Sequence, residues 1–226
     1  MFGAKRAVFV SDPEMIKHFL VTNSNNYERR PPVRRFNQLF RDGIFNSRGE
    51  VWKSQRRSAR LFFSNLDHHI PTILKHTNDL INNIDSTTVD LQEVFYDLTL
   101  RIICDIGFGV RKPKNVKQFN KDFNRIQEIV ENNLRNPILE YLPDAEFELI
   151  NSRLSDFAND IIQQSEPRSQ SLLSQDDSRD TVLNFIIAGR DTTATLLTWT
   201  FFCLSLHPKI TKRLRREIKA ISEPFS

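Results

Sequence analysis

Apolar residues recur every three to four positions along most of this 226-residue chain, which is the spacing of one face of an α-helix. The pattern predicts helices over residues 12–20, 50–62, 69–84, 91–106, 116–134, 144–164 and 209–220, with a short helical piece at 36–40. A longer and more continuously apolar helix is expected over 182–206, ending near His207 because Pro208 follows. The chain is therefore expected to be mainly α-helical.

The N-terminus departs from this spacing. The segment RAVFVSD, residues 6–12, alternates and predicts one short β-strand, after which Asp12 and Pro13 suit the start of the first helix. Residues 23–32 are polar and end in a proline pair, so they predict an irregular loop. Residues 165–179 are polar and rich in serine, and predict a connection before the long helix. We find no internal repeat and no clear domain boundary.

Composition places the chain among ordinary globular proteins, with 39% apolar and 27% charged residues. Eighteen phenylalanines stand against three tyrosines and two tryptophans. This bias indicates either an ordinary aromatic core or a ligand cavity that favours aromatic bulk without hydroxyl groups. The sequence leaves both interpretations open.

The formal net charge is +4, and the basic residues are bunched within residues 29–36 and 52–60. Such bunching favours an anionic partner: phosphate, a membrane surface or ligand carboxylates. Nucleic acid is not expected, since no recognition motif accompanies the basic residues. Cys104 and Cys203 lie in apolar sequence and form no metal-type pair, so no metal site is predicted. The apolar run at the N-terminus is too short for a signal peptide or anchor.

The middle of the long predicted helix carries residues that are costly in an apolar interior, namely Gly189, Arg190, Asp191, Thr192 and Thr193. A glycine there costs about 1 kcal/mol relative to alanine, and an unpaired buried carboxylate costs far more. On a helix, Ala188, Asp191 and Thr192 share one face, with Gly189 adjoining, so a flat ligand can approach the backbone. The Thr192 hydroxyl is also spaced to bond the Ala188 carbonyl. The alternative is that Asp191 pairs with a neighbouring cation and the threonines merely pack.

This stretch resembles the central helix of the cytochrome P-450 haem-thiolate monooxygenases, whose pattern is [AG]-G-x-[DE]-T-[TS] and which reads here as AGRDTT over residues 188–193. The resemblance implies haem as cofactor, with Ala188 and Gly189 over its distal face. It also implies that Thr192 hydrogen-bonds the bound dioxygen and that Asp191 helps to deliver protons.

A second match lies upstream, in the segment WKSQR. Trp52 and Arg56 are spaced i, i+4 and so share a helical face. In the family, W-x-x-x-R supplies an indole donor and a guanidinium to a haem propionate; the alternative is a packed tryptophan beside a solvated arginine. Residues 42–57 and 182–194 both resemble the plant and fungal fatty-acid omega-hydroxylase branch, and the resemblance runs from about Ala7 to Ile218.

The branch implies a fatty acid or a similar lipid as substrate. Its substrate-contacting loop corresponds to residues 30–46, where Phe36, Phe40 and Phe45 would line a cavity or, alternatively, simply pack. A redox partner reductase is also implied. The endoplasmic reticulum membrane is the implied location of the complete protein, and this chain without an anchor is expected to be cytoplasmic or peripheral.

Two motifs of the family are missing from this sequence. No glutamate is followed three positions later by arginine, and neither cysteine lies in F-x-x-G-x-R-x-C-x-G, whose thiolate ligates the iron. We therefore interpret residues 1–226 as one incomplete cytochrome P-450 domain: mainly α, with a long central helix, a short N-terminal β element and no proximal cysteine ligand. Such a chain is either a monooxygenase family member that is not competent alone, or a non-catalytic helical fragment that binds a partner or a lipid surface.

Overall fold

A computed structural model describes residues 8–27, 33–63, 66–84, 88–165 and 178–222. Contacts divide the chain into two compact units, Met1–Pro32 and Val33–Ser226. The described residues are mainly helical, which confirms the predicted class. No described helix has both the length and the apolar character that crossing a membrane requires.

The first unit begins its helices where the sequence predicts. Helix α1, Pro13–Lys17, has Asp12 as its N-cap, and the Asp12 carboxylate accepts a hydrogen bond from the Met15 amide at 2.9 Å. A π-helix, His18–Thr22, and a 3-10 turn, Ser24–Asn26, follow. The predicted strand over residues 6–12 is not confirmed: the described part, residues 8–12, forms no strand, and residues 6 and 7 lie outside the described ranges.

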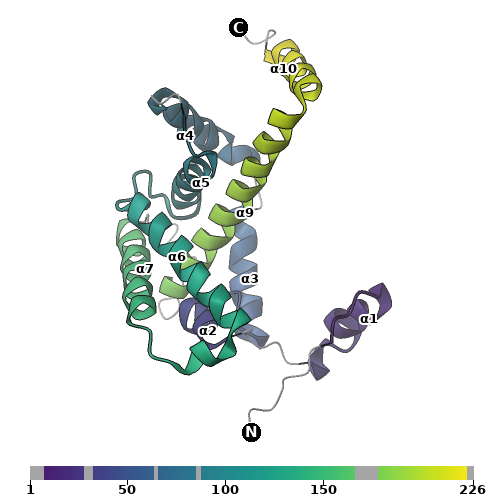
Figure 1. Cartoon of the computed structure of the whole chain (residues 1–226), viewed down its shortest axis with the longest axis vertical. Coiled ribbons are helices and arrows are strands. Elements are labelled where there is room, and N and C mark those ends of the chain that lie inside the picture. Colours follow the sequence, from purple (N-terminus) through teal and green to yellow (C-terminus); the bar gives the residue numbers. More distant parts are fainter. Residues whose placement is uncertain (1–7, 28–32, 64–65, 85–87, 166–177, 223–226) are drawn as a thin grey trace. The chain divides into compact units, whose positions relative to one another are not determined.

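The second unit is a set of helices (Figure 1). They are α2 (Arg34–Phe40), α3 (Gly49–Phe63), α4 (Ile70–Asn83), α5 (Leu91–Phe108), α6 (Val116–Arg135), α7 (Ala145–Gln164), α9 (Ser178–Leu206) and α10 (Pro208–Ser222), with 3-10 turns at Leu66–His69 and Pro137–Tyr141. These bounds lie within a few residues of those that the apolar spacing predicts. The difference at α9 is that the helix begins at Ser178, inside the predicted polar connection of residues 165–179, of which residues 166–177 lie outside the described ranges.

Local sequence signals explain where these helices start and stop. The Asp144 carboxylate accepts from the Phe147 amide at 2.9 Å and caps α7. Gly109 ends α5 with a φ of 72°, a left-handed conformation that glycine adopts without strain. Pro208 begins α10 immediately after the break at His207, as predicted.

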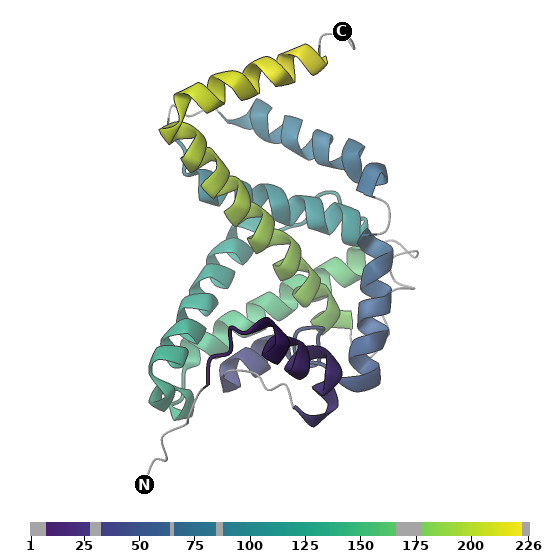
Figure 2. The same cartoon turned by 90° about the vertical axis from the view of Figure 1, so that its right-hand side faces the viewer.

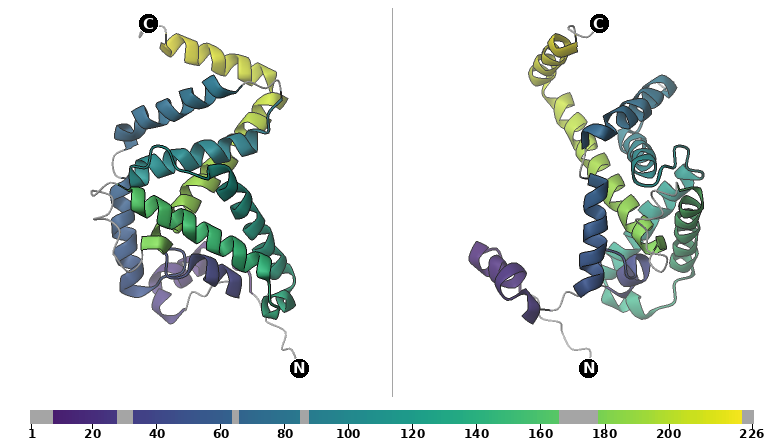
Figure 3. Two further views of the ribbon diagram at one scale, coloured as in Figure 1. Left: turned by 90° about the vertical axis from the view of Figure 1, so that its left-hand side faces the viewer. Right: turned by 180° about the vertical axis from the view of Figure 1, so that it is seen from behind.

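The first half of α9 lies in the core of the second unit. Helix α5 packs along α9 more extensively than any other described helix, and α7 also packs on α9 and on α6. Helix α9 runs between α3 and the pair formed by α6 and α7, as seen in Figure 2 and, from behind, in the right-hand view of Figure 3. The buried aromatic side chains of this core are Phe40, Phe108, Phe119, Phe123, Phe147, Phe157 and Phe185. Much of the phenylalanine content therefore serves ordinary packing.

Candidate functional site

The middle of α9 presents one accessible polar face. The Thr192 hydroxyl donates a hydrogen bond to the Ala188 carbonyl at 2.7 Å, as its spacing predicts. Thr192 is exposed and Ala188 is half-buried. A hydroxyl satisfied in this way is compatible with the helix interior and keeps its own lone pairs available to a ligand.

Gly189 lies against a neighbouring helix. A β-carbon built on Gly189 would lie 2.9 Å from two side-chain carbons of Ile103 in α5. The space beside this glycine is therefore occupied by a neighbouring helix, and its missing side chain is explained by the close packing of α5 on α9. Ala188 and Gly189 are both half-buried, and a haem contact at either residue stays a prediction.

Arg190 is fully buried, although arginine is rarely found there. Its Nε donates to Asn120 Oδ1 at 2.7 Å and its Nη2 donates to Asn124 Oδ1 at 2.8 Å. The guanidinium also lies over the Tyr96 ring, 3.9 Å from the ring centroid. Three helices, α5, α6 and α9, thus meet at one charged group. Sequence reasoning missed this residue, and the available signal was the i, i+4 pair of asparagines in α6.

Asp191 is held by two partners. It forms an ion pair with Arg190, and its Oδ2 accepts from Gln127 Nε2 of α6 at 2.7 Å. Burial raises the pKa of Asp191 above its ordinary value, while Arg190 and Gln127 both lower it. Pairing with a neighbouring cation was the alternative interpretation of this residue, and the ion pair is present. Its predicted part in proton delivery stays a prediction.

Trp52 and Arg56 lie together on α3, as their spacing predicts. The Arg56 guanidinium carbon is 5.4 Å from the centroid of the Trp52 ring. Trp52 is half-buried and Arg56 is exposed, and the described part of the chain gives Arg56 no carboxylate partner. This pair is therefore able to donate hydrogen bonds to an anionic group, although the geometry also fits a tryptophan packed beside a solvated arginine.

The three predicted substrate-contacting rings form one aromatic row. Ring centroids of Phe36 and Phe40 are 4.4 Å apart, and those of Phe40 and Phe45 are 5.3 Å apart. Phe40 is buried, and Phe36 and Phe45 pack against the core beside it. The structure thus brings the three residues together by packing, and contact with a substrate stays a prediction.

Asn184 of α9 is the second residue near the site that sequence reasoning missed. It is fully buried and donates to the Phe40 carbonyl at 3.3 Å, and its side-chain oxygen accepts from the Phe45 amide at 3.2 Å. The signal was a lone asparagine in an otherwise apolar helix, since a buried amide needs partners.

Neither cysteine is suited to a haem iron on the face opposite α9. Cys104 is fully buried in the core, and burial raises the pKa of its thiol far above the ordinary value. Cys203 is exposed, but it lies on α9 itself, the helix predicted to cover the distal face. Within the described ranges, no group of three or more His, Cys, Asp or Glu residues is arranged to hold a metal ion.

Comparison with known proteins decides the family. The family profile described as Cytochrome P450 matches residues 1–166 and 144–225, which together cover nearly the whole sequence. The chain belongs to the cytochrome P450 family. Among solved structures, CYP175A1 from Thermus thermophilus superposes with a TM-score of 0.67 and 22% identity, over 80% of this chain and 46% of that one. That likeness shows the fold.

Several plant and fungal P450 proteins are similar over almost the full chain. Cytochrome P450 704B1 of Arabidopsis thaliana is 27% identical over 95% of this chain and 51% of its own length. Cytochrome P450 52A3-B of Candida maltosa is 28% identical over 96% and 49%, and cytochrome P450 94A2 of Vicia sativa is 29% identical over 98% and 52%. The chain spans about half the length of the curated relatives that it matches.

The residues present fit part of a haem site. Ala188 and Thr192 form an accessible face with a hydroxyl, and Arg56 offers an exposed guanidinium beside an indole. These are the groups that a distal surface and a propionate require. The buried Cys104 does not fit the proximal position, so the fit is limited to one side of the cofactor.

Proposed function

We propose that this chain supplies the distal half of a haem monooxygenase site and is not competent for turnover alone. The observation that carries the proposal is the accessible Thr192 hydroxyl on the Ala188 carbonyl, next to Asp191, in a chain of the P450 family. Haem, when bound, supplies the chemistry of dioxygen activation. Its proximal cysteine would come from outside residues 1–226.

Thr192 and Asp191 have distinct proposed tasks. The Thr192 hydroxyl orients a polar ligand at the open face of α9, since it both donates and accepts hydrogen bonds. Asp191 is proposed to take part in proton delivery, and burial raises its pKa above the ordinary value, which makes the protonated form easier to reach.

Trp52 and Arg56 are proposed to hold a haem propionate through the indole N–H and the guanidinium. A charge-assisted hydrogen bond of this kind contributes roughly 1.5–3 kcal/mol. The exposed position of Arg56 supports this role, because the group remains available to an external anion.

The proposed substrate is a fatty acid or a similar lipid, oxidised with dioxygen and reducing equivalents from a reductase. Support comes from the resemblance to the plant and fungal omega-hydroxylase branch and from the aromatic row of Phe36, Phe40 and Phe45. The proposed location is the endoplasmic reticulum membrane for the complete protein. Nucleic acid is not a proposed partner.

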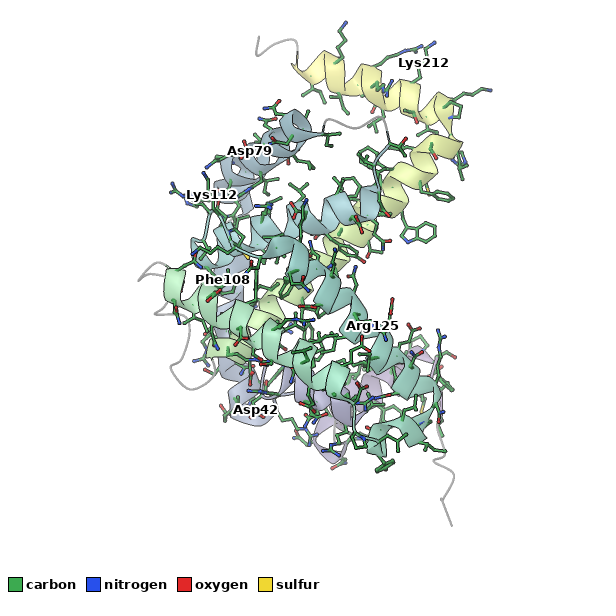
Figure 4. All side chains as sticks on the ribbon, turned by 60° about the vertical axis from the view of Figure 1, so that its left-hand side comes forward. Asp42, Asp79, Phe108, Lys112, Arg125 and Lys212 are labelled. Carbon is green, nitrogen blue, oxygen red and sulfur yellow. The ribbon has the colours of Figure 1, made fainter. Side chains whose placement is uncertain are left out.

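A second candidate function is partner or lipid-surface binding without catalysis. It is favoured by an open groove of about 610 Å³ along the end of α9 and most of α10, lined by Leu204 and Pro208 and by the basic residues Lys212, Arg215, Arg216 and Lys219. Figure 4 shows Lys212 extending from α10. An apolar floor with a basic rim suits an anionic amphiphile.

One spectrum distinguishes these functions. The purified chain is loaded with haem, reduced and treated with carbon monoxide, with Thr192→Val as the matched variant. We expect haem uptake without the Soret shift of a thiolate complex, and an altered spectrum in Thr192→Val. A thiolate-type shift would show that the chain supplies its own proximal ligand, and absence of any uptake would contradict a distal half-site.

A further inference from the structure

The loop between α2 and α3, residues 41–48, is hydrogen-bonded to the first turns of α9. Asn184 lies at the centre of this contact and is fully buried. Its Nδ2 donates to the Asp180 carbonyl at 2.7 Å and to the Phe40 carbonyl at 3.3 Å, and its Oδ1 accepts from the Phe45 amide at 3.2 Å. One amide group thus forms hydrogen bonds with the backbone at both ends of the segment that carries Phe40 and Phe45.

The loop is shaped around this amide. A β-carbon built on Gly43 would lie 2.0 Å from Asn184 Nδ2 and 2.4 Å from its Cγ. Only a residue without a side chain leaves room at position 43 for the asparagine. Gly43 and Asn184 are therefore sterically complementary, although 141 positions separate them (184 − 43).

Other hydrogen bonds tie the same segment to its surroundings. The Asp42 amide donates to Asp180 Oδ2 at 3.3 Å, and Gln55 Nε2 of α3 donates to the Asp42 carbonyl at 2.8 Å. Arg179 Nη1 donates to the Leu39 carbonyl at 3.0 Å. Figure 4 labels Asp42 near the end of the unit where α9 begins. Of these groups, Asn184 alone contacts the backbone of both Phe40 and Phe45.

The chemistry of the contact selects asparagine. A buried backbone N–H requires an acceptor and a buried carbonyl requires a donor, and a side-chain amide supplies both. Aspartate at this position would place an acceptor against two carbonyls. Leucine would remove the acceptor of the Phe45 amide, whereas the Phe40 carbonyl would still accept from the Gly43 amide at 3.0 Å.

We infer that Asn184 is a positioning residue that sets Phe40 and Phe45 relative to the Ala188–Thr192 face. Asn184 and Ala188 are four positions apart on one rigid helix, about 6 Å along its axis. The aromatic row is thereby fixed at a set distance from the proposed site of oxidation. We call the hydrogen bonds of Asn184 to the backbone of Phe40 and Phe45 the tether. Its effect on substrate rests on the proposed function: the tether determines which fatty-acid chain length is preferred.

The first measurement follows amide hydrogen exchange in the full 226-residue chain. Asn184→Ala is expected to raise the exchange rate of the Phe45 amide roughly three- to tenfold, which corresponds to the net contribution of one buried hydrogen bond. The Leu154 amide, in the buried part of α7, reports global opening and is used to normalise the rate. An unchanged normalised rate at Phe45 would overturn the inference.

The matched control is Thr99→Val. It removes a different buried hydrogen bond to α9, the one that the Thr99 hydroxyl donates to the Arg190 carbonyl at 3.0 Å. This variant loses a buried hydrogen bond without touching residues 40–45. We expect its normalised Phe45 rate to stay within roughly twofold of wild type. An equal rise in Thr99→Val and Asn184→Ala would show a general loosening of α9 and would overturn a specific tether.

The steric complement gives a second test. Gly43→Ala alone should raise the Phe45 rate, because its new methyl group collides with the Asn184 amide. In the double variant Gly43→Ala, Asn184→Ala, that methyl group has space, so the combined increase should be smaller than the product of the two single increases. A simple product would contradict the contact on which the inference depends.

The consequence for substrate is tested with laurate and palmitate as probes. Titration calorimetry of the haem-loaded chain is expected to show a laurate to palmitate affinity ratio that changes roughly threefold or more in Asn184→Ala and stays constant in Thr99→Val. A constant ratio in both variants would overturn the positioning role. Failure of wild type to bind either acid, with the Phe45 exchange result intact, would refute the proposed substrate class and leave the tether supported.

Discussion

The two ends of α9 differ sharply in burial although both are apolar. At the first end, all six residues 182–187 are buried, because helices α2, α5 and α7 pack around them. At the other end, Leu196, Trp199 and Leu206 are 66%, 61% and 60% exposed. Burial along this helix is therefore determined by whether other helices pack around it, and not by residue type alone.

The predicted site lies at the boundary between these two ends. On one side, Arg190 is enclosed by α5 and α6, and Gly189 contacts Ile103. On the other side, Thr192 and Thr193 are exposed. This boundary gives the site a fixed base and an open face, which is what a ligand surface requires.

The largest expected effect comes from removing the buried cation. Arg190→Leu should lower the free energy of unfolding by about 3–5 kcal/mol, because Asp191 loses its ion-pair partner and two asparagine side chains lose theirs. Arg213→Leu is the control: Arg213 is paired with Glu217 at the exposed surface of α10 and should contribute less than about 1 kcal/mol. Urea unfolding measures both, and similar losses would contradict the enclosed role of Arg190.

The comparison of the two ends of α9 predicts the next effect. Leu183→Ala should lower the free energy of unfolding by about 2–5 kcal/mol, since Leu183 is fully buried and a cavity remains. Leu196→Ala should change it by less than about 0.5 kcal/mol, because this side chain is exposed. Equal losses of unfolding free energy for the two leucines would contradict the difference in burial between the two ends of α9.

Packing at the boundary predicts an intermediate effect. Gly189→Ala should cost about 1–3 kcal/mol of unfolding free energy, because the new methyl group overlaps Ile103. In the background Ile103→Ala the same substitution should be tolerated better, by about 0.5–3 kcal/mol of coupling in a double-mutant cycle. If the two unfolding free-energy changes were simply additive, the contact with Ile103 would not explain the glycine at position 189.

A smaller effect is expected from pH. Burial raises the folded-state pKa of Asp191 above its unfolded value, so the folded protein binds this proton more tightly. The stability that this group contributes is present at low pH and declines as pH rises from about 3.9, the ordinary aspartate value, through the raised pKa. The stability difference between wild type and Asp191→Asn, from urea unfolding between about pH 3 and 7, should show this decline. A rise with pH would mean that Arg190 outweighs burial.

Local features of the fold could be predicted from the sequence, and long-range contacts could not. Asp12, Asp144, Gly109 and Pro208 mark helix ends because their effect acts on adjacent backbone. The Arg190 contacts join residues about 70 positions apart, and spacing on one helix gives no information about them. The strand expected over residues 6–12 needs a partner strand, and the described residues supply none.

In the candidate site, too, local contacts could be predicted from the sequence and long-range contacts could not. The bond between Thr192 and Ala188 and the stacking of Arg56 on Trp52 follow from i, i+4 spacing, and both are present. The packing contacts of Gly189 and Asn184 were not predictable, because each involves a residue from a distant segment, Ile103 and Gly43 respectively.

Haem titration of a single-tryptophan variant tests the central claim most directly. The chain has two tryptophans, so Trp199→Phe leaves Trp52 as the reporter. We expect haem to quench the Trp52 emission saturably, and adding Arg56→Leu should weaken the haem affinity roughly tenfold, as loss of one charge-assisted hydrogen bond requires. Quenching that is absent, or an affinity that Arg56→Leu leaves unchanged, would contradict a haem half-site that uses Trp52 and Arg56.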